Sequence, residues 1–225
     1  MRDFHVFIEQ QGEQIYVGKI TGSGSEDAVF SYAQEYLDNP SSCPISIHLP
    51  LQAQNFSAEE TSLFFEGLLP EGFTRKCVAG WIHADEYDYL TILAALGREC
   101  LGAIQIIEDG MDVPKAGYQK LTKEDVCRLA KEGASEAAEL VTKAHLSLTG
   151  ASGKVGLYYK IDTNEWYLPI GAAPSTHIVK QSHVRLDGIV TNEQLCLQTA
   201  KNLGIDVPDS FVQTADPVSY THLRA

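Results

Sequence analysis

The chain has 225 residues, 44% of them hydrophobic and 21% charged, which suffices for one large or two small globular domains. Its 30 acidic residues outnumber its 17 lysines and arginines, and the formal charge of −13 disfavours direct binding to nucleic acid. No apolar run approaches the roughly 20 residues that cross a bilayer, and the N-terminus lacks the pattern of a secretory signal, so we expect no membrane contact and a cytoplasmic location.

The first third of the chain is predicted to form strands followed by helices. Residues 4–9 and 14–20 alternate polar and apolar side chains, and the short connection Gln11-Gly12-Glu13 between them is typical of a hairpin. Residues 28–32 and 45–49 are predicted to add two more strands.

Three helices and a further strand are predicted next. Ser57 with Glu60 three positions later is a capping box, which starts the first helix at Ala58. Gly97 is expected to end the third helix as a C-terminal glycine cap. The predicted bounds are 58 to about 70, 72–82 and 86–96 for the helices, and 101–107 for the strand.

Residues 108–117 (EDGMDVPKAG) are polar and rich in Gly and Pro, which predicts a boundary between subdomains. Thr122 with Asp125 indicates a short helix over 122–132. The part beyond it is predicted to be β-rich with one main helix, which Gly204 closes. Its predicted bounds are 146–148, 155–161, 166–170 and 176–180 for the strands, and 192–203 for the helix.

The five cysteines are odd in number and widely spaced, with no C-x-x-C pair and no histidine at zinc-ligand spacing. We therefore expect reduced thiols, most of them buried as small apolar side chains.

A glycine-rich stretch, LTGASGKVG, is a candidate phosphate-binding turn. Gly150, Gly153 and Gly156 alternate with small residues, so backbone N–H groups can approach phosphate oxygens. Because Lys154 is followed by Val155 rather than Ser or Thr, the pattern is not that of a P-loop NTPase. A plain hairpin uses the same residues, so the motif alone leaves both interpretations open.

Two further residues favour nucleotide binding. Lys180 ends the β-branched strand STHIVK, where a lysine either extends into solvent or reaches ATP phosphates. Glu193, near the start of the next helix, is the candidate carboxylate partner of Lys180, although the helix dipole alone also stabilises a first-turn acidic residue. The order of glycine-rich turn, strand lysine and helix glutamate favours the nucleotide-binding interpretation.

Over nearly its whole length the chain resembles the HipA-type toxin kinases of bacterial type II toxin–antitoxin systems. In the first part the resemblance rests on VGKI at 17–20, PISIHLPL at 44–51, and FFEGLLPEG at 64–72 followed by Arg75. In the second part it rests on LSLTGASGKVGLYY at 146–159, PSTHIVK at 174–180 and TNEQLCLQTAKNLGIDVPDSFV at 191–212.

The resemblance implies a serine/threonine protein kinase that uses ATP and magnesium and is toxic by phosphorylating a translation component, in some members glutamyl-tRNA synthetase. It also implies a helix-turn-helix antitoxin of the HipB type, through which operator DNA is reached indirectly. By position the resemblance assigns the phosphate loop to Gly150, Ala151, Ser152, Gly153 and Lys154. It assigns the nucleotide lysine to Lys180 and the helix partner of that lysine to Glu193. Ser152 departs from the glutamine that many members have there.

The family's Asp-Gly-His-x-x-Asn motif and its later magnesium aspartate do not occur in the sequence. Asp206, Asp209 and Asp216 are expected to be solvated turn residues. We therefore expect an N-terminal fragment that is inactive alone, without the C-terminal catalytic lobe, and with apolar surface exposed around Leu195 and Phe211. Leu197 is expected to share that exposed surface.

The predicted fold class is α+β, a mixed sheet and helix subdomain followed by a β-rich subdomain like a kinase N-lobe. The predicted bounds are 1–108 for the first, 109–145 for a linker with a helix, 146–214 for the second, and 215–225 for a tail with the character of a non-native end. The alternative is a non-enzymatic interaction module that binds an antitoxin or another regulator.

Overall fold

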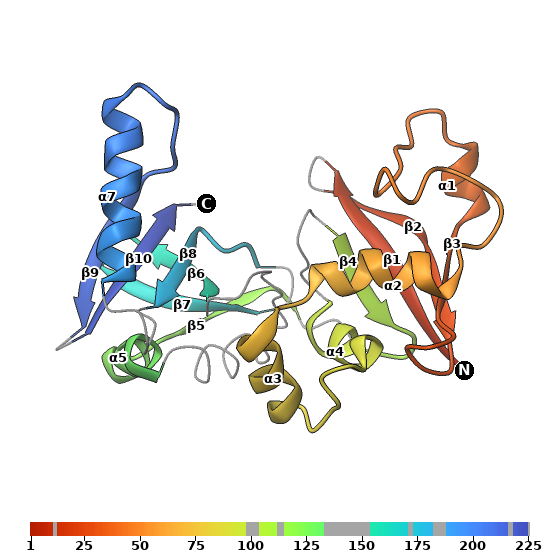
Figure 1. Cartoon of the computed structure of the whole chain (residues 1–225), viewed down its shortest axis with the longest axis horizontal. Helices are drawn as coiled ribbons and strands as arrows, with labels where there is room; N and C mark the ends of the chain where they lie inside the picture. The colour runs from red at the N-terminus through yellow and green to blue at the C-terminus, as the bar shows by residue number, and fades with distance from the viewer. Residues whose placement is uncertain are drawn as a thin grey trace.

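The protein is described by a computed structural model, which covers residues 1–10, 13–97, 104–111, 115–132, 154–170, 173–181, 188–215 and 218–224. Figure 1 shows two parts, each built around one antiparallel sheet. The first sheet has the strand order β3-β2-β1-β4 and the second the order β5-β7-β6-β8-β10-β9. The predicted α+β fold class is confirmed. The predicted bounds at 145 and 146 fall outside the described residues and stay predictions.

The first sheet contains the strands expected near the N-terminus. Its members are β1 (Arg2–Gln10), β2 (Glu13–Gly22), β3 (Val29–Tyr32) and β4 (Ile104–Glu108). The alternating pattern places apolar side chains on the buried face, so that Phe4 and Val6 of β1 have no exposed surface. Residues 11 and 12 of the predicted hairpin connection lie outside the described residues.

Gly18 marks a close approach between two strands of this sheet. It lies opposite Tyr32 of β3, beside a register shift in the pairing of β1 with β2. A Cβ at Gly18 would lie 2.1 Å from the carbonyl oxygen of Ser31. The glycine of the VGKI motif is therefore required by backbone packing.

Three helices of the first part follow the predicted order, and α1 was not predicted. The helices are α1 (Gln34–Asp38), α2 (Ala58–Phe65) continued by the 3-10 turn η1 (Glu66–Leu68), α3 (Gly72–Trp81) and α4 (Tyr89–Leu96). The capping box is confirmed: Ser57 Oγ accepts from the Glu60 N–H at 3.2 Å, and the Ser57 N–H donates to the Glu60 carboxylate at 2.8 Å. The helix predicted from 86 begins only at Tyr89, because Asp88 caps it by accepting from the Thr91 N–H at 3.2 Å.

Gly97 does end α4, but for a different reason from the one expected. Its φ of −68° is not left-handed, so it is not the usual glycine cap. A Cβ there would lie 2.6 Å from the carbonyl oxygen of Leu93 and 2.9 Å from Ile106. Glycine is needed at this position because β4 packs directly against the end of α4.

The strand predicted at 45–49 is wrong. The segment holds one isolated bridge, between Ser46 and Leu49, and folds around the hydroxyl of Tyr32. That hydroxyl donates to the Leu49 carbonyl at 2.5 Å and accepts from the Ile45 N–H at 3.1 Å. The apolar residues are therefore fixed by a buried tyrosine rather than by a strand ladder.

The second sheet contains three of the predicted strands and three that were not predicted. Its strands are β5 (Gly117–Lys120), β6 (Lys154–Lys160), β7 (Glu165–Ile170), β8 (His177–Gln181), β9 (Ser210–Ala215) and β10 (Val218–Arg224). The strands predicted at 155–161, 166–170 and 176–180 correspond to β6, β7 and β8 and are confirmed. The strand predicted at 146–148 lies outside the described residues.

Two helices accompany this sheet, α5 (Lys123–Glu132) and α7 (Ile189–Asn202). Thr122 caps α5 as predicted, since its Oγ1 accepts from the Asp125 N–H at 3.1 Å. The second helix begins three residues before its predicted start, directly after Gly188, whose φ is 77°.

The segment predicted to be a non-native tail contributes β10 to the sheet. This strand lies between β8 and β9, with Tyr220 opposite Gln181 and Leu223 opposite Ser210. Strand pairing says nothing about the origin of a sequence, so the non-native character of 215–225 stays a prediction.

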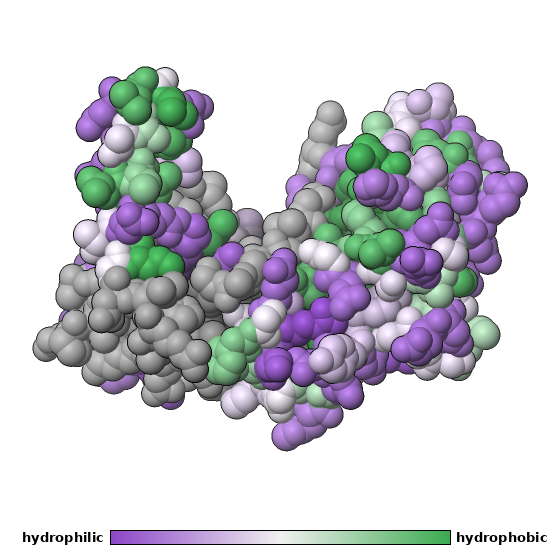
Figure 2. Space-filling model, in the orientation of Figure 1, coloured by the Kyte–Doolittle hydropathy of each residue, from purple (hydrophilic) through white to green (hydrophobic). Residues whose placement is uncertain are grey.

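Buried side chains from both sheets belong to one contiguous apolar cluster, which includes Phe4 and Phe30 from the first part and Val155 and Val179 from the second. The exposed apolar surface expected on α7 and β9 is present at Leu195 and Phe211, whereas Leu197 is half-buried. Figure 2 shows hydrophobic side chains along α7 and the loop that follows it.

The expectation of buried cysteines is wrong at two of the three cysteines whose side chains are described. Cys43 and Cys196 are exposed, and Cys77 is half-buried. Within the described ranges, none of the helices combines the length and the apolar character that a bilayer span requires.

Candidate functional site

The pairing of β6 with β8 brings two of the predicted site lysines together. Lys154 lies directly opposite Lys180 in the antiparallel register, and Gly156 lies opposite Ile178 on the same sheet face. Two like charges at directly opposed positions destabilise a sheet unless an anion lies between or beside them. This arrangement therefore needs negative charge from elsewhere.

Glu193 of α7 supplies part of that charge. Its carboxylate forms an ion pair with the Lys180 ammonium, and the two side chains are only 29% and 25% exposed. The partnership predicted between the strand lysine and the helix glutamate is thus present in the geometry. Such a pair is partly shielded from solvent, so it orients the lysine more firmly than a fully exposed pair would.

The start of α7 also bears on the competing interpretation of Glu193. Since the helix begins at Ile189, Glu193 is its fifth residue and lies beyond the first turn, which contains no acidic side chain. Stabilisation by the helix dipole is confined to the terminal turn and does not explain a glutamate at this place. The ion pair with Lys180 does explain it.

Lys154 lies half-buried at the edge of this cluster. Burial lowers the pKa of its ammonium, and the positive charge of Lys180 lowers it further. The carboxylates of Glu193 and Glu71 act in the opposite direction. The carboxylate of Glu193 thus pairs with Lys180 and also acts on the charge of Lys154.

The charge of this site suits nucleotide phosphates. Lysine ammonium groups bind phosphate as point charges, and two of them here face a common surface of the sheet. The other predicted site residues, Gly150, Ala151, Ser152 and Gly153, lie outside the described residues. The structure therefore brings together Lys154, Lys180 and Glu193, and their role in ATP binding stays a prediction.

A magnesium site has less support in the part of the chain that is described. No group of three histidine, cysteine or carboxylate side chains there is arranged to hold a metal ion. Asp206 is exposed, and Asp209 accepts from the Lys201 ammonium at 3.2 Å in the exposed loop after α7. Asp216 lies outside the described ranges.

Sequence reasoning missed the effect of Glu71, whose negative charge raises the pKa of Lys154. Glu71 precedes α3 in the first part of the chain, whereas Lys154 begins β6 in the second. The available signal was its place in the FFEGLLPEG stretch, but no spacing rule connects a residue there with a strand more than eighty positions away.

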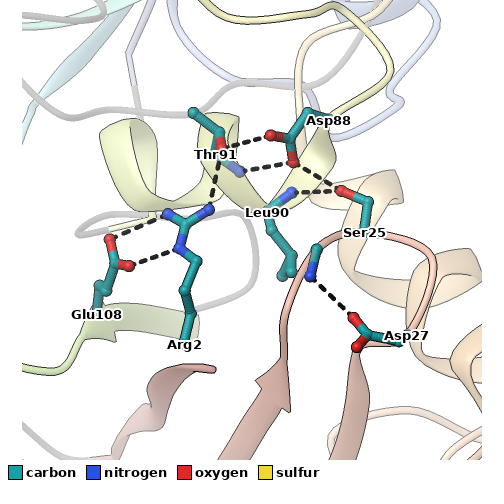
Figure 3. Close-up of polar contacts among 8 residues, drawn as sticks. Arg2, Ser25, Asp27, Asp88, Leu90, Thr91 and Glu108 are labelled. Atoms are coloured by element: carbon teal, nitrogen blue, oxygen red, sulfur yellow. Dashed lines mark hydrogen bonds and ion pairs between the residues drawn. The ribbon is translucent and has the colours of Figure 1, made fainter.

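A second polar cluster lies in the first part of the molecule (Figure 3). The Arg2 guanidinium donates to both carboxylate oxygens of Glu108, at 2.6 and 3.1 Å, and to Thr91 Oγ1 at 3.0 Å. Ser25 donates to the Asp88 carboxylate at 2.7 Å, and Asp88 caps α4. These bonds tie β1, β4, α4 and the β2–β3 loop to one another, so we interpret the cluster as structural.

Family models match most of the chain. A model described as the HipA N-terminal domain matches residues 11–107, and one described as the HipA-like C-terminal domain matches residues 146–223. The first match contains β2, β3 and most of β4, and the second contains Lys154, Lys180 and Glu193.

Curated proteins extend the comparison. The chain is 32% identical over 200 residues to Y4mE of Sinorhizobium fredii, covering 85% of this chain and 47% of that protein. It is 25% identical over 203 residues to the serine/threonine-protein kinase toxin HipA of Shewanella oneidensis, covering 89% of this chain and 45% of that protein. It also shares 30% identity over 112 residues with an uncharacterized protein of Haemophilus influenzae, covering 48% of this chain and 98% of that protein.

Among solved structures, the chain resembles HipA of Shewanella oneidensis MR-1 in a complex with HipB and its operator DNA. The TM-score is 0.74 at 20% identity, and the match covers 98% of this chain and 50% of that one. At this identity the likeness establishes the fold. The chain spans about half the length of Y4mE and of the Shewanella toxin.

Proposed function

This chain belongs to the HipA family, and on that premise we propose that it forms the ATP-holding part of a serine/threonine protein kinase toxin. Lys154 and Lys180 bind the phosphates, and Glu193 orients Lys180. Gly150, Ala151, Ser152 and Gly153 complete the phosphate loop with backbone N–H groups.

The observation that carries the proposal is the Lys180–Glu193 ion pair beside Lys154. A strand lysine held by a helix carboxylate is the arrangement with which protein kinases position the α- and β-phosphates of ATP. Bound ATP would supply the transferable phosphoryl group. The chain's own residues would then contribute orientation and positive charge at its phosphates.

We further propose that these 225 residues bind nucleotide without completing the transfer. In-line phosphoryl transfer needs an aspartate that orients the substrate hydroxyl and ligands that hold magnesium. The sequence contains no Asp-Gly-His-x-x-Asn motif, and Asp209 is engaged by Lys201 in an exposed loop.

The proposed substrate is a serine or threonine of a translation component such as glutamyl-tRNA synthetase, and the proposed partner is a HipB-type antitoxin. The Shewanella HipA structure, which holds HipB and operator DNA, supports the partner. The charge of −13 supports indirect contact with DNA through that partner, since an acidic surface repels the phosphate backbone.

The test is a calorimetric titration of the chain with Mg-ATP, run on the wild type and on Lys180→Met. Removal of a charge-assisted contact should weaken binding by about tenfold or more. Lys201→Met is the matched control, because Lys201 lies on α7, the helix that carries Glu193, and its ion-pair partner is the exposed Asp209. Equal affinities in Lys180→Met and Lys201→Met would contradict the proposed role of Lys180.

A radiolabelled-phosphate assay separates binding from transfer. We expect no phosphate incorporation into the chain itself or into added glutamyl-tRNA synthetase. Incorporation by the wild type, lost in Lys180→Met, would show that transfer does not need further residues.

The second candidate function is a non-enzymatic interaction module for an antitoxin. It is favoured by the HipB-bound relative and by the exposed apolar side chains of α7 and its following loop, among them Leu195, Leu203 and Ile205. Binding of a HipB-type protein with unchanged affinity in Lys180→Met, together with no detectable ATP binding, would favour this function over the first.

A further inference from the structure

The helix α3 turns its largest apolar side chains toward solvent. Its buried residues are Thr74, Val78 and Ala79, whereas Phe73 is 66% exposed and Trp81 is 49% exposed. A surface helix normally presents polar residues to solvent and buries its large apolar ones, because burial of one aromatic ring removes about 150–250 Å² from water. The packing of α3 in its own part of the chain therefore does not explain its outward face.

The two aromatic residues belong to one strip of that face. Positions 73, 77, 80 and 81 share one side of an α-helix, and Figure 1 shows α3 at the lower edge of the molecule. Between the rings, Cys77 is half-buried, and a Cβ at the exposed Gly80 would meet nothing within 4 Å. The α3 strip (Phe73, Cys77, Gly80 and Trp81) thus has a ring at each end and small residues between them, where an apolar side chain of a partner fits.

The part of the chain that carries the α3 strip also carries all of the net charge. Residues 1–114 hold 18 acidic residues and five lysines and arginines, whereas residues 115–225 hold 12 of each. The formal charge of −13 therefore belongs to the first part alone. A charge difference of this size between the halves of a chain indicates a cationic partner for the acidic half.

The cations of α3 itself do not offset this charge. The Arg75 guanidinium pairs with the Glu66 carboxylate at 2.7 Å, and the Lys76 ammonium lies 3.6 Å from the Glu86 carboxylate. The exposed Glu71 directly precedes the helix and adds a further negative charge. The rim of the α3 strip is thus acidic, and lysines or arginines of a partner complement it.

We propose that the α3 strip is a docking surface for a basic amphipathic helix of a partner protein. The apolar face of that helix covers Phe73 and Trp81, and its cationic residues meet the acidic rim. A helix fits better than an extended segment, because the backbone of α3 is hydrogen-bonded internally and offers no sheet edge for strand addition. The inference does not rest on ATP binding, since Lys154, Lys180 and Glu193 contribute nothing to the strip.

Charge disfavours the other occupants of such an apolar surface. A second copy of the chain would place the same acidic surface against itself across a two-fold axis. Anionic lipids and nucleic acid are repelled by it for the same reason. A basic helix is instead attracted over a long range and then buries the two rings.

The probe is a synthetic helical peptide of about 18 residues, with leucines along one face and lysines elsewhere. Its binding is followed by fluorescence anisotropy of an attached fluorescein, for the wild type, Phe73→Ser and Ile47→Ser. Ile47 is the control, because it is an apolar side chain that is 87% exposed on another segment. Phe73→Ser should bind the peptide about tenfold more weakly than Ile47→Ser, as expected for the loss of an aromatic anchor.

Two results of this titration would overturn the inference. The first is equal affinity of Phe73→Ser and Ile47→Ser for the lysine peptide, or no binding by the wild type. The second is equally tight binding of a peptide in which glutamates replace the lysines, since the acidic rim should repel it. Circular-dichroism melting should show the same Tm for both variants and the wild type, because both side chains are exposed.

Tryptophan emission reports where the peptide binds. The chain has two tryptophans, and Trp166 is only 5% exposed. Covering the α3 strip should therefore shift the emission of Trp81 to shorter wavelengths, and Trp81→Phe should show no shift. A shift that persists in Trp81→Phe would place the peptide elsewhere and overturn the inference.

Two further measurements test the occupants that charge disfavours. Analytical ultracentrifugation of the wild type alone should not show a dimer that Phe73→Ser dissociates. Vesicles of phosphatidylglycerol should not bind the wild type through Phe73. Either behaviour would assign the α3 strip to a second copy or to a membrane surface and overturn the proposed partner.

Discussion

Replacement of Thr61 by valine tests how the edge of the first sheet is protected. Thr61 lies on α2 with no exposed surface, and its Oγ1 accepts from the Phe30 N–H at 2.9 Å. Phe30 belongs to β3, an edge strand of its sheet, and its carbonyl accepts from the Phe56 N–H at 2.9 Å. The outward polar groups of this edge residue are thus both occupied from within the chain.

The expected cost of Thr61→Val follows from which groups lose their partners. The Ser57 carbonyl, to which the Thr61 hydroxyl donates at 2.8 Å, keeps the Thr61 backbone N–H as a donor at 3.0 Å. The Phe30 N–H loses Thr61 Oγ1 as its acceptor, and a buried donor left unpaired costs about 1–3 kcal/mol. We expect a loss of about 2 kcal/mol in the free energy of unfolding, which in a chain of this length lowers Tm by about 4–8 °C.

Thr61→Ser is the control, because it keeps the hydroxyl and removes one buried methyl group, at a cost of about 1 kcal/mol. Urea unfolding followed by circular dichroism should rank the proteins wild type, then Thr61→Ser, then Thr61→Val. Side-chain hydrophobicity alone would instead place Thr61→Val first, the wild type second and Thr61→Ser last. A Thr61→Val protein as stable as Thr61→Ser would refute the reasoning.

Three further perturbations follow from the structure. His83→Gly should raise the free energy of unfolding by about 0.5–1 kcal/mol, because His83 has a φ of 56°; His83→Ala, which keeps the strain, should not. Gly18→Ala should lower the free energy of unfolding by about 2–3 kcal/mol in the same urea titration, because the new Cβ meets the Ser31 carbonyl. An unchanged free energy of unfolding would mean that β2 and β3 move apart easily. Hydrogen bonding from Lys120 lowers the pKa of Glu165 to about 2, so the stability from this pair is complete above about pH 4.5 and is lost as the pH falls toward 2. Glu165→Gln should reduce the loss of stability over that pH range. An unchanged loss of stability in this variant would contradict the attribution to Glu165.

The candidate site was predictable in its parts and not in its arrangement. The β-branched strand before Lys180 and the helix that carries Glu193 follow from local sequence patterns, and the structure pairs the two side chains. The pattern placed the helix start at residue 192, which left the dipole explanation of Glu193 open. Only the real start at Ile189 puts the glutamate beyond the first turn and removes that explanation.

The structural role of some residues is visible only in the tertiary structure. Gly18 appears in the sequence as a residue inside a predicted strand and Gly97 as a helix cap, but each is required by a backbone that approaches from another element. Residues 45–49 have the composition of a strand, and the hydroxyl of the buried Tyr32 holds them in another conformation. Tertiary contacts outweigh strand propensity there, because the propensity differs by only about 1 kcal/mol between residues.

The sequence by itself determined the features that act over a few residues. Ser57 and Glu60 stand three positions apart, as do Thr122 and Asp125, so their capping bonds form within one helical turn and are legible as patterns. The family also followed from motifs that run in order along the chain.

Only the tertiary structure decided which distant residues share one site. The register of β6 with β8 sets Lys154 against Lys180, and the packing of α3 brings Glu71 into their field. Neither arrangement has a sequence spacing of its own, because each depends on how separately formed elements bury their apolar faces against one another. The charged residues of the candidate site were therefore visible in the sequence, and their arrangement in space was not.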